Sequence, residues 1–514
     1  MKASGVALIA IALSMSQLAG ARGTGSASAG SDDDDEDSGS ATGSANAAPH
    51  DARSRLPWLH ERIRAAISSR PALAKEKLGI AIVDLVTGDE LYSKDADVGL
   101  NLASNTKLLT TVAALGVLGS GFHWRTAVYS DKLDEATGVV DGDLYVRGRG
   151  DPELSQRDLR ELAADVAARG IRTVTGKLVV DGSYFDAQVE PPHYDEEPNE
   201  RAGFRAPVAS FGVGRSAVTV VVVAEPGGGA AQVRLEPDAG DYVRITKREV
   251  TTVTTGHTRI SVASKPRGDH VEIEVTGQIR AADGDYELRR RVDDPARFAG
   301  EVFRKALAER GVTIKHGGVT AGAVPTGARE VASHDSAELA SVIRDMNKYS
   351  DNYIAESVLK TLGAETRAGG GPGTWADGQN AVKAYLGKLG VTGYRADNGS
   401  GLFGSTSVSP HQLVTLLRAA HADFKMFPDL LASLPIGGVD GTLAKRWHGR
   451  AALGRVRAKT GTLDQVISLS GYVGMDAGHL IAFAIVENDM PGSQRGAARS
   501  LADEIVDDLL AYVK

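Results

Sequence analysis

The stretch that decides the fold of this 514-residue chain is Ala103-Ser104-Asn105-Thr106-Lys107-Leu108-Leu109-Thr110-Thr111. Ser104 and Lys107 form an S-x-x-K motif, and the apolar residues that follow it have a helical spacing, which predicts a buried helix. Residues three apart share one face of a helix, so the lysine amine can reach the serine hydroxyl. A desolvated lysine can lose its proton near neutral pH and activate an adjacent hydroxyl. Taken alone, the motif is more often a surface serine and a solvated lysine.

A second polar group stands where a downstream helical pattern breaks, at Lys348-Tyr349-Ser350-Asp351-Asn352. Ser350 and Asn352 are two apart on this predicted inter-helix loop and can both point into one cleft. There the hydroxyl can move a proton and the amide can hold a substrate carbonyl. The alternative is a helix cap, a role that Ser, Asp and Asn commonly fill, and in isolation the cap is the simpler interpretation.

The third segment is a predicted strand that carries Lys459-Thr460-Gly461-Thr462. It presents a cation, a hydroxyl and a backbone that a peptide can approach closely because glycine has no side chain. Such an edge can bind a peptide as an added strand, with Lys459 attracting its carboxylate. The alternative is a turn between two strands.

Both ends of the chain contribute to the predicted core. Residues 78–85 and 90–93 read as two strands, and three more follow from 456 onward, with a helix over 497–513. We therefore expect one antiparallel sheet made from both ends and flanked by helices. Between them, residues 124–325 alternate short β-rich runs with Gly, Asp and Pro turns, and only 158–169 and 296–310 look helical.

These patterns divide the chain into five predicted parts. Residues 1–21 have a basic start, a short apolar run and an Ala19-Gly20-Ala21 cleavage site, typical of a secretory signal cleaved near Ala21. The Gly/Ser/Asp-rich residues 22–54 predict a disordered acidic linker. A discontinuous catalytic domain then covers 55–123 and 327–514. It is interrupted by an inserted β-rich domain, 124–148 and 227–326, and by a second nested domain, 149–226.

Composition excludes several classes of function. The formal net charge is −8, with six acidic residues in the run 32–37, so there is no basic footprint for nucleic acid. The chain has no cysteine, hence no disulfides. No H-E-x-x-H or comparable ligand cluster occurs, so we expect no metal and no cofactor. The signal predicts export to the periplasm, with no transmembrane segment after its removal.

S-x-x-K, S-x-N and K-T-G occur together, in this order, in penicillin-binding proteins and class A β-lactamases. The chain more closely resembles the D-alanyl-D-alanine carboxypeptidase/endopeptidase family of low-molecular-mass class C penicillin-binding proteins, the S13 serine peptidases. The similarity covers about residues 57–514. The passages that carry it are 143–154, 346–352, 399–402, 441–443 and 457–463.

The resemblance implies an α/β (α+β type) penicillin-binding transpeptidase/β-lactamase-like domain with an antiparallel sheet and two nested β-rich domains. It also implies five catalytic residues. Ser104 would attack the carbonyl between two D-alanines with Lys107 as base, Ser350 would relay the proton, Asn352 would bind the peptide, and Lys459 would hold the terminal carboxylate. The substrate would be a peptidoglycan stem peptide, and β-lactam antibiotics would be covalent inhibitors.

The resemblance further implies a substrate-binding strand at Thr460, Gly461 and Thr462. Thr460 would share the terminal carboxylate with Lys459. The backbone N–H groups of Thr462 and Ser104 would form the oxyanion hole.

Two positions depart from the family pattern. Gly214 stands where the family usually has an asparagine, and Gly404 stands where it usually has an arginine after Ser-Gly-Leu-Ser. That arginine helps to bind the charged end of the stem-peptide side chain, while an acidic residue, here one of 195–197, takes its amine. Its absence questions side-chain recognition unless Arg395 or another arginine reaches the same place.

Two alternatives stay open at this point. One is a serine β-lactamase or esterase; against it, neither Glu356 nor Glu365 has the E-x-x-x-N spacing associated with deacylation. The other is a catalytically silent peptidoglycan-binding protein. The intact pair of Ser104 and Lys107 argues against it, because binding does not need a nucleophile and a base.

Overall fold

The computed structural model describes residues 48–49, 51–73, 77–474 and 478–513. The predicted signal peptide, 1–21, and all but the last few residues of the predicted linker lie outside the described residues. The first element is helix α1, Ala52–Ser68, so the folded part begins slightly before the predicted boundary at residue 55.

The catalytic sheet has five antiparallel strands in the order β17-β18-β19-β1-β2. Strand β1 pairs along its whole length with β19, which joins the N-terminal hairpin to the C-terminal strands and confirms the predicted sheet. The strands are β1 (Lys77–Asp84), β2 (Glu90–Lys94), β17 (Val456–Leu463), β18 (Val466–Gly474) and β19 (Leu480–Asn488).

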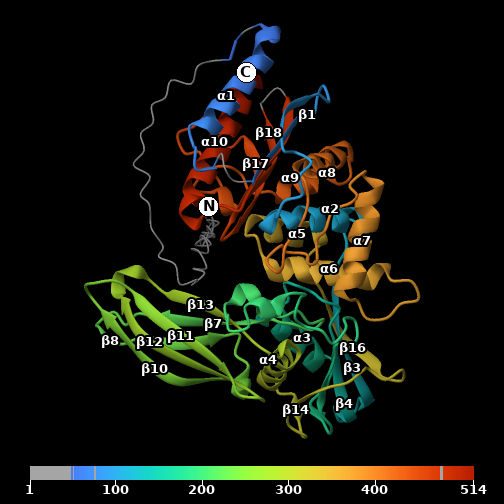
Figure 1. Cartoon of the computed structure of the whole chain (residues 1–514). Coiled ribbons are helices and arrows are strands. Elements are labelled where there is room, and N and C mark those ends of the chain that lie inside the picture. The colour runs from blue at the N-terminus through green and yellow to red at the C-terminus, as the bar shows by residue number, and fades with distance from the viewer. Residues whose placement is uncertain (1–47, 50, 74–76, 475–477, 514) are drawn as a thin grey trace, which may run out of the picture.

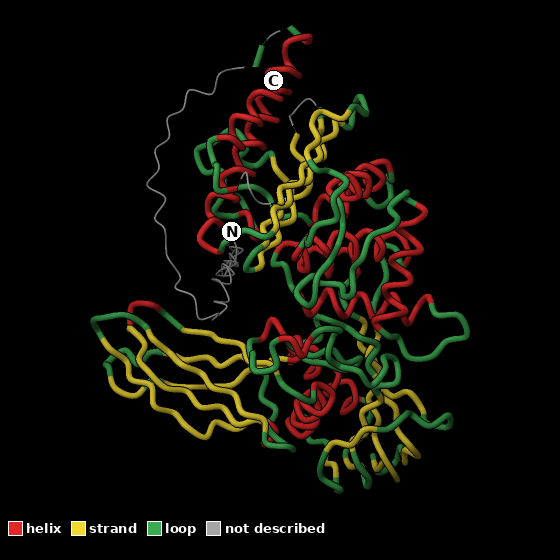
Figure 2. The backbone as a smooth tube through the Cα atoms, viewed as in Figure 1, coloured by secondary structure: helices red, strands yellow, loops and turns green. Residues whose placement is uncertain are grey.

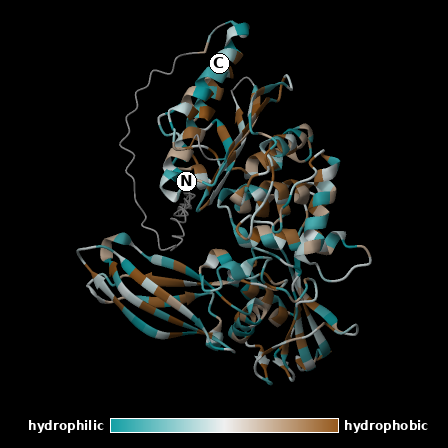
Figure 3. Cartoon of the chain, in the orientation of Figure 1, coloured by the Kyte–Doolittle hydropathy of each residue, from teal (hydrophilic) through white to brown (hydrophobic). Residues whose placement is uncertain are grey.

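Helices cover both faces of this sheet, as Figure 1 shows. Alternate residues of a strand point to opposite faces, and in β1 Ile80 and Ile82 join the core under α1 and α10, whereas Ala81 and Val83 join the core under the other helices. Because both faces are buried, β1 has no polar residue between Leu78 and Val83 and does not alternate, and Figure 3 shows brown, hydrophobic stretches in this sheet. The helices are α10 (Arg495–Val513) on the first face and, on the second, α2 (Lys107–Val117), α5 (Leu339–Lys348), α6 (Asn352–Thr366), α7 (Trp375–Lys388), α8 (Pro410–Ala422) and α9 (Phe427–Ser433).

An insert interrupts the catalytic part between α2 and α5. Its entry strand β3 pairs with its exit strand β16, Arg125 opposite Asp335, so the chain leaves and returns at one place. These strands belong to a seven-stranded sheet. Its members are β3 (Arg125–Asp134), β4 (Val139–Arg147), β5 (Thr173–Val174), β6 (Leu178–Asp181), β14 (Thr313–Ile314), β15 (Val319–Ala321) and β16 (Arg329–Asp335), with helices α3 (Gln156–Ala168) and α4 (Pro295–Glu309) alongside.

A second group of strands is nested inside the first, and Figure 2 shows the two groups as separate sets of strands. It consists of a three-stranded sheet, β13-β7-β9, and a four-stranded sheet, β11-β12-β10-β8. Their bounds are β7 (Ala217–Val223), β8 (Gly229–Ala230), β9 (Gln232–Glu236), β10 (Val243–Val253), β11 (Arg259–Pro266), β12 (Val271–Arg280) and β13 (Tyr286–Arg291).

Strand pairing divides the insert differently from the predicted boundaries. Residues 149–226, predicted as the nested domain, contribute β5 and β6 to the seven-stranded sheet and β7 to the nested one. The nested strands run from Ala217 to Arg291 instead. The reason is long-range strand pairing, because β5 and β6 pair with β14 and β15 more than a hundred residues later. Local sequence composition does not indicate which distant strands pair. None of the helices in the described part of the chain has the length and apolar character needed to cross a bilayer.

Candidate active site

Ser104 and Lys107 lie at the start of α2, and the structure brings them together. The chain forms a short 3-10 turn, Ala103–Thr106, before the α-helix begins at Lys107, so the single predicted helix has a tighter first turn. The Nζ of Lys107 lies 3.0 Å from the Oγ of Ser104. The lysine side chain is completely buried, whereas Ser104 is half-buried and can meet a substrate.

Helix α2 is fixed to the sheet by a polar contact next to Ser104. Asn105 is buried and its Nδ2 donates to the Oγ of Ser468 on β18, which in turn donates to the carbonyl of Leu102. Because buried polar groups are normally hydrogen-bonded, these two bonds help to hold the 3-10 turn against the strand.

Ser350 and Asn352 lie in the turn between α5 and α6, where Asp351 is the residue that caps α6 through the backbone N–H of Ile354. The capping alternative therefore describes Asp351, which leaves its neighbours free for other contacts. The Oδ1 of Asn352 accepts a hydrogen bond from Lys107 at 2.7 Å. Ser350 has a φ of 57°, a left-handed conformation that costs about 1–3 kcal/mol outside glycine and is commonest at functional sites.

Strand β17 is an edge of the sheet and carries Lys459, Thr460, Gly461 and Thr462. The Nζ of Lys459 donates to the Oγ of Ser350 at 2.8 Å, and Thr460 donates to the Oγ1 of Thr442 at 2.8 Å. The four residues thus do not form a turn, because the strand continues to Leu463.

Glycine at position 461 lets β17 approach Ser104 closely. A Cβ at this position would lie 3.1 Å from the backbone nitrogen of Ser104 and 2.5 Å from the carbonyl of Leu102. The contact with the Leu102 carbonyl is too short for a real Cβ atom and the contact with the Ser104 nitrogen is tight, so glycine lets the strand come this close. Thr462 is exposed beside it.

The two buried lysines are electrostatically perturbed. Burial lowers the pKa of Lys107 to about 7, although the charges of Glu356 and Asp351 raise it again in part. Burial and then the charge of Lys107 also lower the pKa of Lys459. A neutral amine at Lys107 is therefore accessible near neutral pH, and an arriving anion would restore the charge of Lys459.

Glu356 on α6 is buried and has a structural task. Its carboxylate accepts hydrogen bonds from the indole of Trp375 and from the backbone N–H groups of Gly399 and Ser400. This holds the loop whose Ser400 carbonyl accepts from Lys107 at 2.9 Å. Both oxygens of Glu356 are occupied, so it does not offer a base for a deacylating water.

Comparison with known proteins decides the family. The family model of "D-Ala-D-Ala carboxypeptidase 3 (S13)" matches residues 59–509. The chain belongs to the S13 family. It is a serine D-Ala-D-Ala carboxypeptidase, as the family resemblance predicted.

Two relatives illustrate the extent of this similarity. The D-alanyl-D-alanine carboxypeptidase of an Actinomadura species is 39% identical over 471 residues, which cover 88% of this chain and 84% of the relative. The solved structure of penicillin binding protein 4 from Haemophilus influenzae is 23% identical, with a TM-score of 0.71 over 86% of this chain and 98% of that one. The fold predicted from the motifs is therefore confirmed.

The structure shows what surrounds Gly404, where the resemblance implies an arginine in the family pattern. Gly404 has a φ of 60°, and a Cβ there would lie 2.7 Å from the ring of His193. Its backbone N–H donates to Glu196, and Arg395 donates to the Oγ of the neighbouring Ser405 at 3.0 Å. The imidazole thus occupies space next to residue 404, while the guanidinium of Arg395 lies one residue away.

The acidic residues expected near this position differ in their partners. Glu197 pairs with Arg205, and Glu196 contacts His193. Asp195 has no ion pair among the residues that the structure describes.

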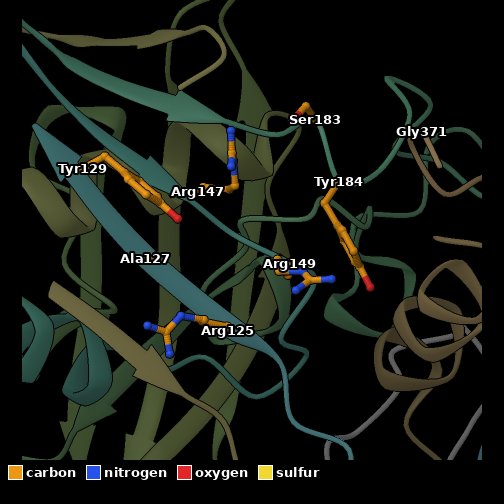
Figure 4. Close-up of a pocket in the computed structure, with 8 residues that line it drawn as sticks. All are labelled: Arg125, Ala127, Tyr129, Arg147, Arg149, Ser183, Tyr184 and Gly371. Atoms are coloured by element: carbon orange, nitrogen blue, oxygen red, sulfur yellow. The ribbon is translucent and has the colours of Figure 1, made fainter. Parts of the chain in front are cut away.

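A separate cavity of about 420 Å³ lies on the inserted sheet, and Figure 4 shows the arginines and tyrosines that line it. Arg149 in its wall pairs with Glu365 near the end of α6, whereas Asn352 begins that helix. Thirteen helical steps of 1.5 Å, about 20 Å in all, separate Asn352 from Glu365, so Arg149 meets α6 near the end opposite to Asn352. Arg125 and Arg147 are also paired with carboxylates. This cavity is therefore not the candidate active site.

Sequence reasoning missed several groups that shape the site. The Ser400 carbonyl, Thr442 and Glu356 contact the predicted residues directly or through one backbone group. The passages 399–402 and 441–443 belong to the resemblance, which is the sequence signal for these groups. Only the fold shows which of their atoms contact Lys107 and Thr460.

Proposed function

We propose that the protein hydrolyses the terminal D-alanyl-D-alanine bond of peptidoglycan stem peptides through an acyl-enzyme on Ser104, and that it also cuts the equivalent bond in cross-links. The observation that supports this most is the buried Lys107 amine, 3.0 Å from the Ser104 hydroxyl and with its pKa lowered to about 7. A serine with such a base one turn away is poised for nucleophilic attack.

Acylation follows from these positions. The neutral Lys107 amine takes the Ser104 proton as Oγ bonds to the carbonyl carbon, and the backbone N–H groups of Ser104 and Thr462 bind the resulting oxyanion. The C–N bond then breaks, and the leaving D-alanine amine receives a proton through Ser350. Asn352 holds the peptide amide during this exchange.

Deacylation reverses the roles. Water attacks the ester carbonyl with Lys107 accepting its proton, the bond to Ser104 breaks, and Ser104 regains a proton. The shortened peptide leaves as a carboxylate, so the overall reaction consumes one water.

The strand residues select a substrate that ends in a carboxylate. Lys459 and the hydroxyl of Thr460 face it, and Gly461 leaves the edge of β17 open to backbone pairing. A buried lysine with a lowered pKa becomes charged when the anion arrives, which makes binding selective for that group.

The substrate also fixes where the protein works. Peptidoglycan lies outside the cytoplasmic membrane, and the sequence 1–21 has the features of a secretory signal. We therefore place the mature protein in the periplasm.

The direct test uses N-acylated peptides that end in D-Ala-D-Ala or, as the matched control, D-Ala-L-Ala. Release of D-alanine from the first and no cleavage of the second supports the proposal. Equal cleavage of both would contradict it. A cross-linked stem-peptide dimer tests the endopeptidase activity in the same assay.

Penicillin is expected to form a long-lived adduct rather than to be turned over. The physical reason is that Glu356, the carboxylate weighed for a β-lactamase-like deacylation, accepts three N–H hydrogen bonds from Trp375, Gly399 and Ser400, and we expect it not to activate a water on the penicilloyl ester. The measurement is the lifetime of the labelled protein after excess penicillin is removed. Rapid hydrolysis of nitrocefin with no trapped intermediate would favour a β-lactamase instead.

Substrate side-chain preference is expected to be weaker than in relatives that carry the arginine. Losing a charged bidentate partner at Gly404 typically removes about 1.5–3 kcal/mol, roughly one to two orders of magnitude in kcat/KM. The measurement compares stem peptides with and without the side-chain carboxylate, in the wild type and in Arg395→Ala. A preference of a hundredfold or more that survives Arg395→Ala would show that another group replaces the missing arginine.

A further inference from the structure

The insert touches the catalytic turn between α5 and α6 at consecutive residues. The carbonyl of Phe204 accepts from the Nδ2 of Asn352 at 3.2 Å, and the Oγ of Ser216 contacts the hydroxyl of Tyr353 at 3.3 Å. Arg215, the residue before Ser216, donates from its Nη1 to the carboxylate of Asp351 at 2.8 Å. Asp351 stands between Ser350 and Asn352 in the chain, so this contact grips the turn at its centre.

The backbone around Arg215 is shaped for this contact. Gly214, Arg215 and Ser216 all have positive φ, of 58°, 57° and 48°. Glycine and asparagine tolerate the left-handed region best, which explains why Gly214 can stand where the family usually has asparagine. Arg215 has no such tolerance, and its conformation is held by surrounding contacts, including the donation from Arg289 to the Gly214 carbonyl at 2.6 Å.

Three carboxylates lie near Arg215, and its ion pair with Asp351 is favoured over the other two. Asp351 is at 2.8 Å, whereas Glu153 and Asp345 lie at 3.6 and 3.8 Å. Burial raises the pKa of Glu153 to about 7, with a further contribution from Asp345, so its competing charge is partly titrated at neutral pH. Burial also raises the pKa of Asp351, but Arg215 and a backbone donor outweigh this, and the net pKa is lowered.

Asp351 also acts on the base. Its charge and that of Glu356 raise the pKa of Lys107, against the effect of burial, whereas the charge of Lys107 adds to burial in lowering the pKa of Lys459. Arg215 pairs with Asp351, so it offsets one of the two carboxylates that keep Lys107 protonated.

We propose that Arg215 is a positioning residue for acylation: from the insert it holds Asp351, and through it the turn that carries Ser350 and Asn352. The inference rests on the proposed function of that turn. It gives the insert a task in the reaction, because β7, which begins at Ala217, anchors Arg215 from outside the catalytic domain.

Replacing Arg215 with methionine should slow acylation by penicillin roughly ten- to hundredfold at neutral pH, the loss typical of one hydrogen bond to a charged group. The unpaired Asp351 would also raise the pKa of Lys107, so the rising limb of the pH–rate profile should move to higher pH. Arg215→Lys keeps the positive charge and should leave the rising limb of the pH–rate profile at its wild-type position. The substitutions have room, because Arg215 lines a cavity of about 470 Å³.

Two further variants make the test specific. Lys265→Ala removes a salt bridge of the insert, to Glu274, that lies away from the catalytic turn, and should behave as the wild type. Asp351→Asn preserves the helix cap, since asparagine caps as well as aspartate, but removes the charge. Asp351→Asn should move the rising limb of the pH–rate profile to lower pH. Adding Arg215→Met to this variant should not move the limb further.

Hydrogen exchange provides a readout that does not depend on catalysis. Exchange of the segment 349–354 should rise in Arg215→Met and not in Lys265→Ala. Failure of the wild type to acylate, with this exchange difference intact, would count against the proposed function alone. The inference would be overturned if Arg215→Met had the wild-type acylation rate, the wild-type pH–rate profile and the wild-type hydrogen exchange of residues 349–354. An equal limb shift by Arg215→Met with and without Asp351→Asn would also overturn it, because Arg215 would then not act through Asp351.

Discussion

Ser104→Ala is expected to lose penicillin labelling and peptide hydrolysis altogether. Removing the nucleophile of a serine hydrolase typically costs roughly 10⁶ in kcat, which places the residual rate below detection. The fold should be retained, because Ser104 is half-buried and the side-chain partner that the structure gives it is Lys107. Labelling with a fluorescent penicillin and a thermal unfolding scan measure the two expectations separately.

Ser183→Ala is the matched control for this variant. Ser183 lines the cavity on the inserted sheet, away from the lysine pair, and its loss should leave labelling unchanged (Figure 4). Labelling of Ser104→Ala at another residue would remove Ser104 from the role of nucleophile.

Lys107→Ala is expected to slow acylation by at least roughly a hundredfold, the usual contribution of a general base. The pH profile carries the same information in the wild type. Because burial lowers the pKa of Lys107 to about 7, the amine becomes neutral above that pH and the acylation rate should rise through it. The measurement is the second-order rate constant for acylation as a function of pH, which reports the free enzyme.

Lys107→Arg separates the base from the cation. Arginine keeps a positive charge near Asn352 and the Ser400 carbonyl but does not lose its proton in this pH range, so it should be as slow as alanine. An active Lys107→Arg variant, or a profile flat through neutral pH, would exclude Lys107 as the base.

Much of the catalytic part could be predicted because its signals are local. The strands 78–85 and 466–473 are mostly apolar, and the chemistry of each of the three motifs limits the elements on which it can lie. Their assembly into one site is long-range, and it became predictable only because the motifs occur together in this order. The structure then brings Lys107 to Asn352 at 2.7 Å across 245 positions of sequence.

What the sequence could not show depends on tertiary contacts. The 3-10 turn at Ser104 is set by the buried contact between Asn105 and Ser468, on a strand near the other end of the chain. The division of the insert depends on strand pairing between distant segments. Arg215 looks like any surface arginine until its partner Asp351 is known.

The most direct test of the account is mass spectrometry of the signal-free protein after reaction with penicillin, followed by digestion and sequencing of the labelled peptide. We predict one penicilloyl group per chain, on the peptide that contains Ser104. An adduct on another residue, or complete turnover of penicillin with no adduct, would contradict the claim that Ser104 and Lys107 form the reactive centre.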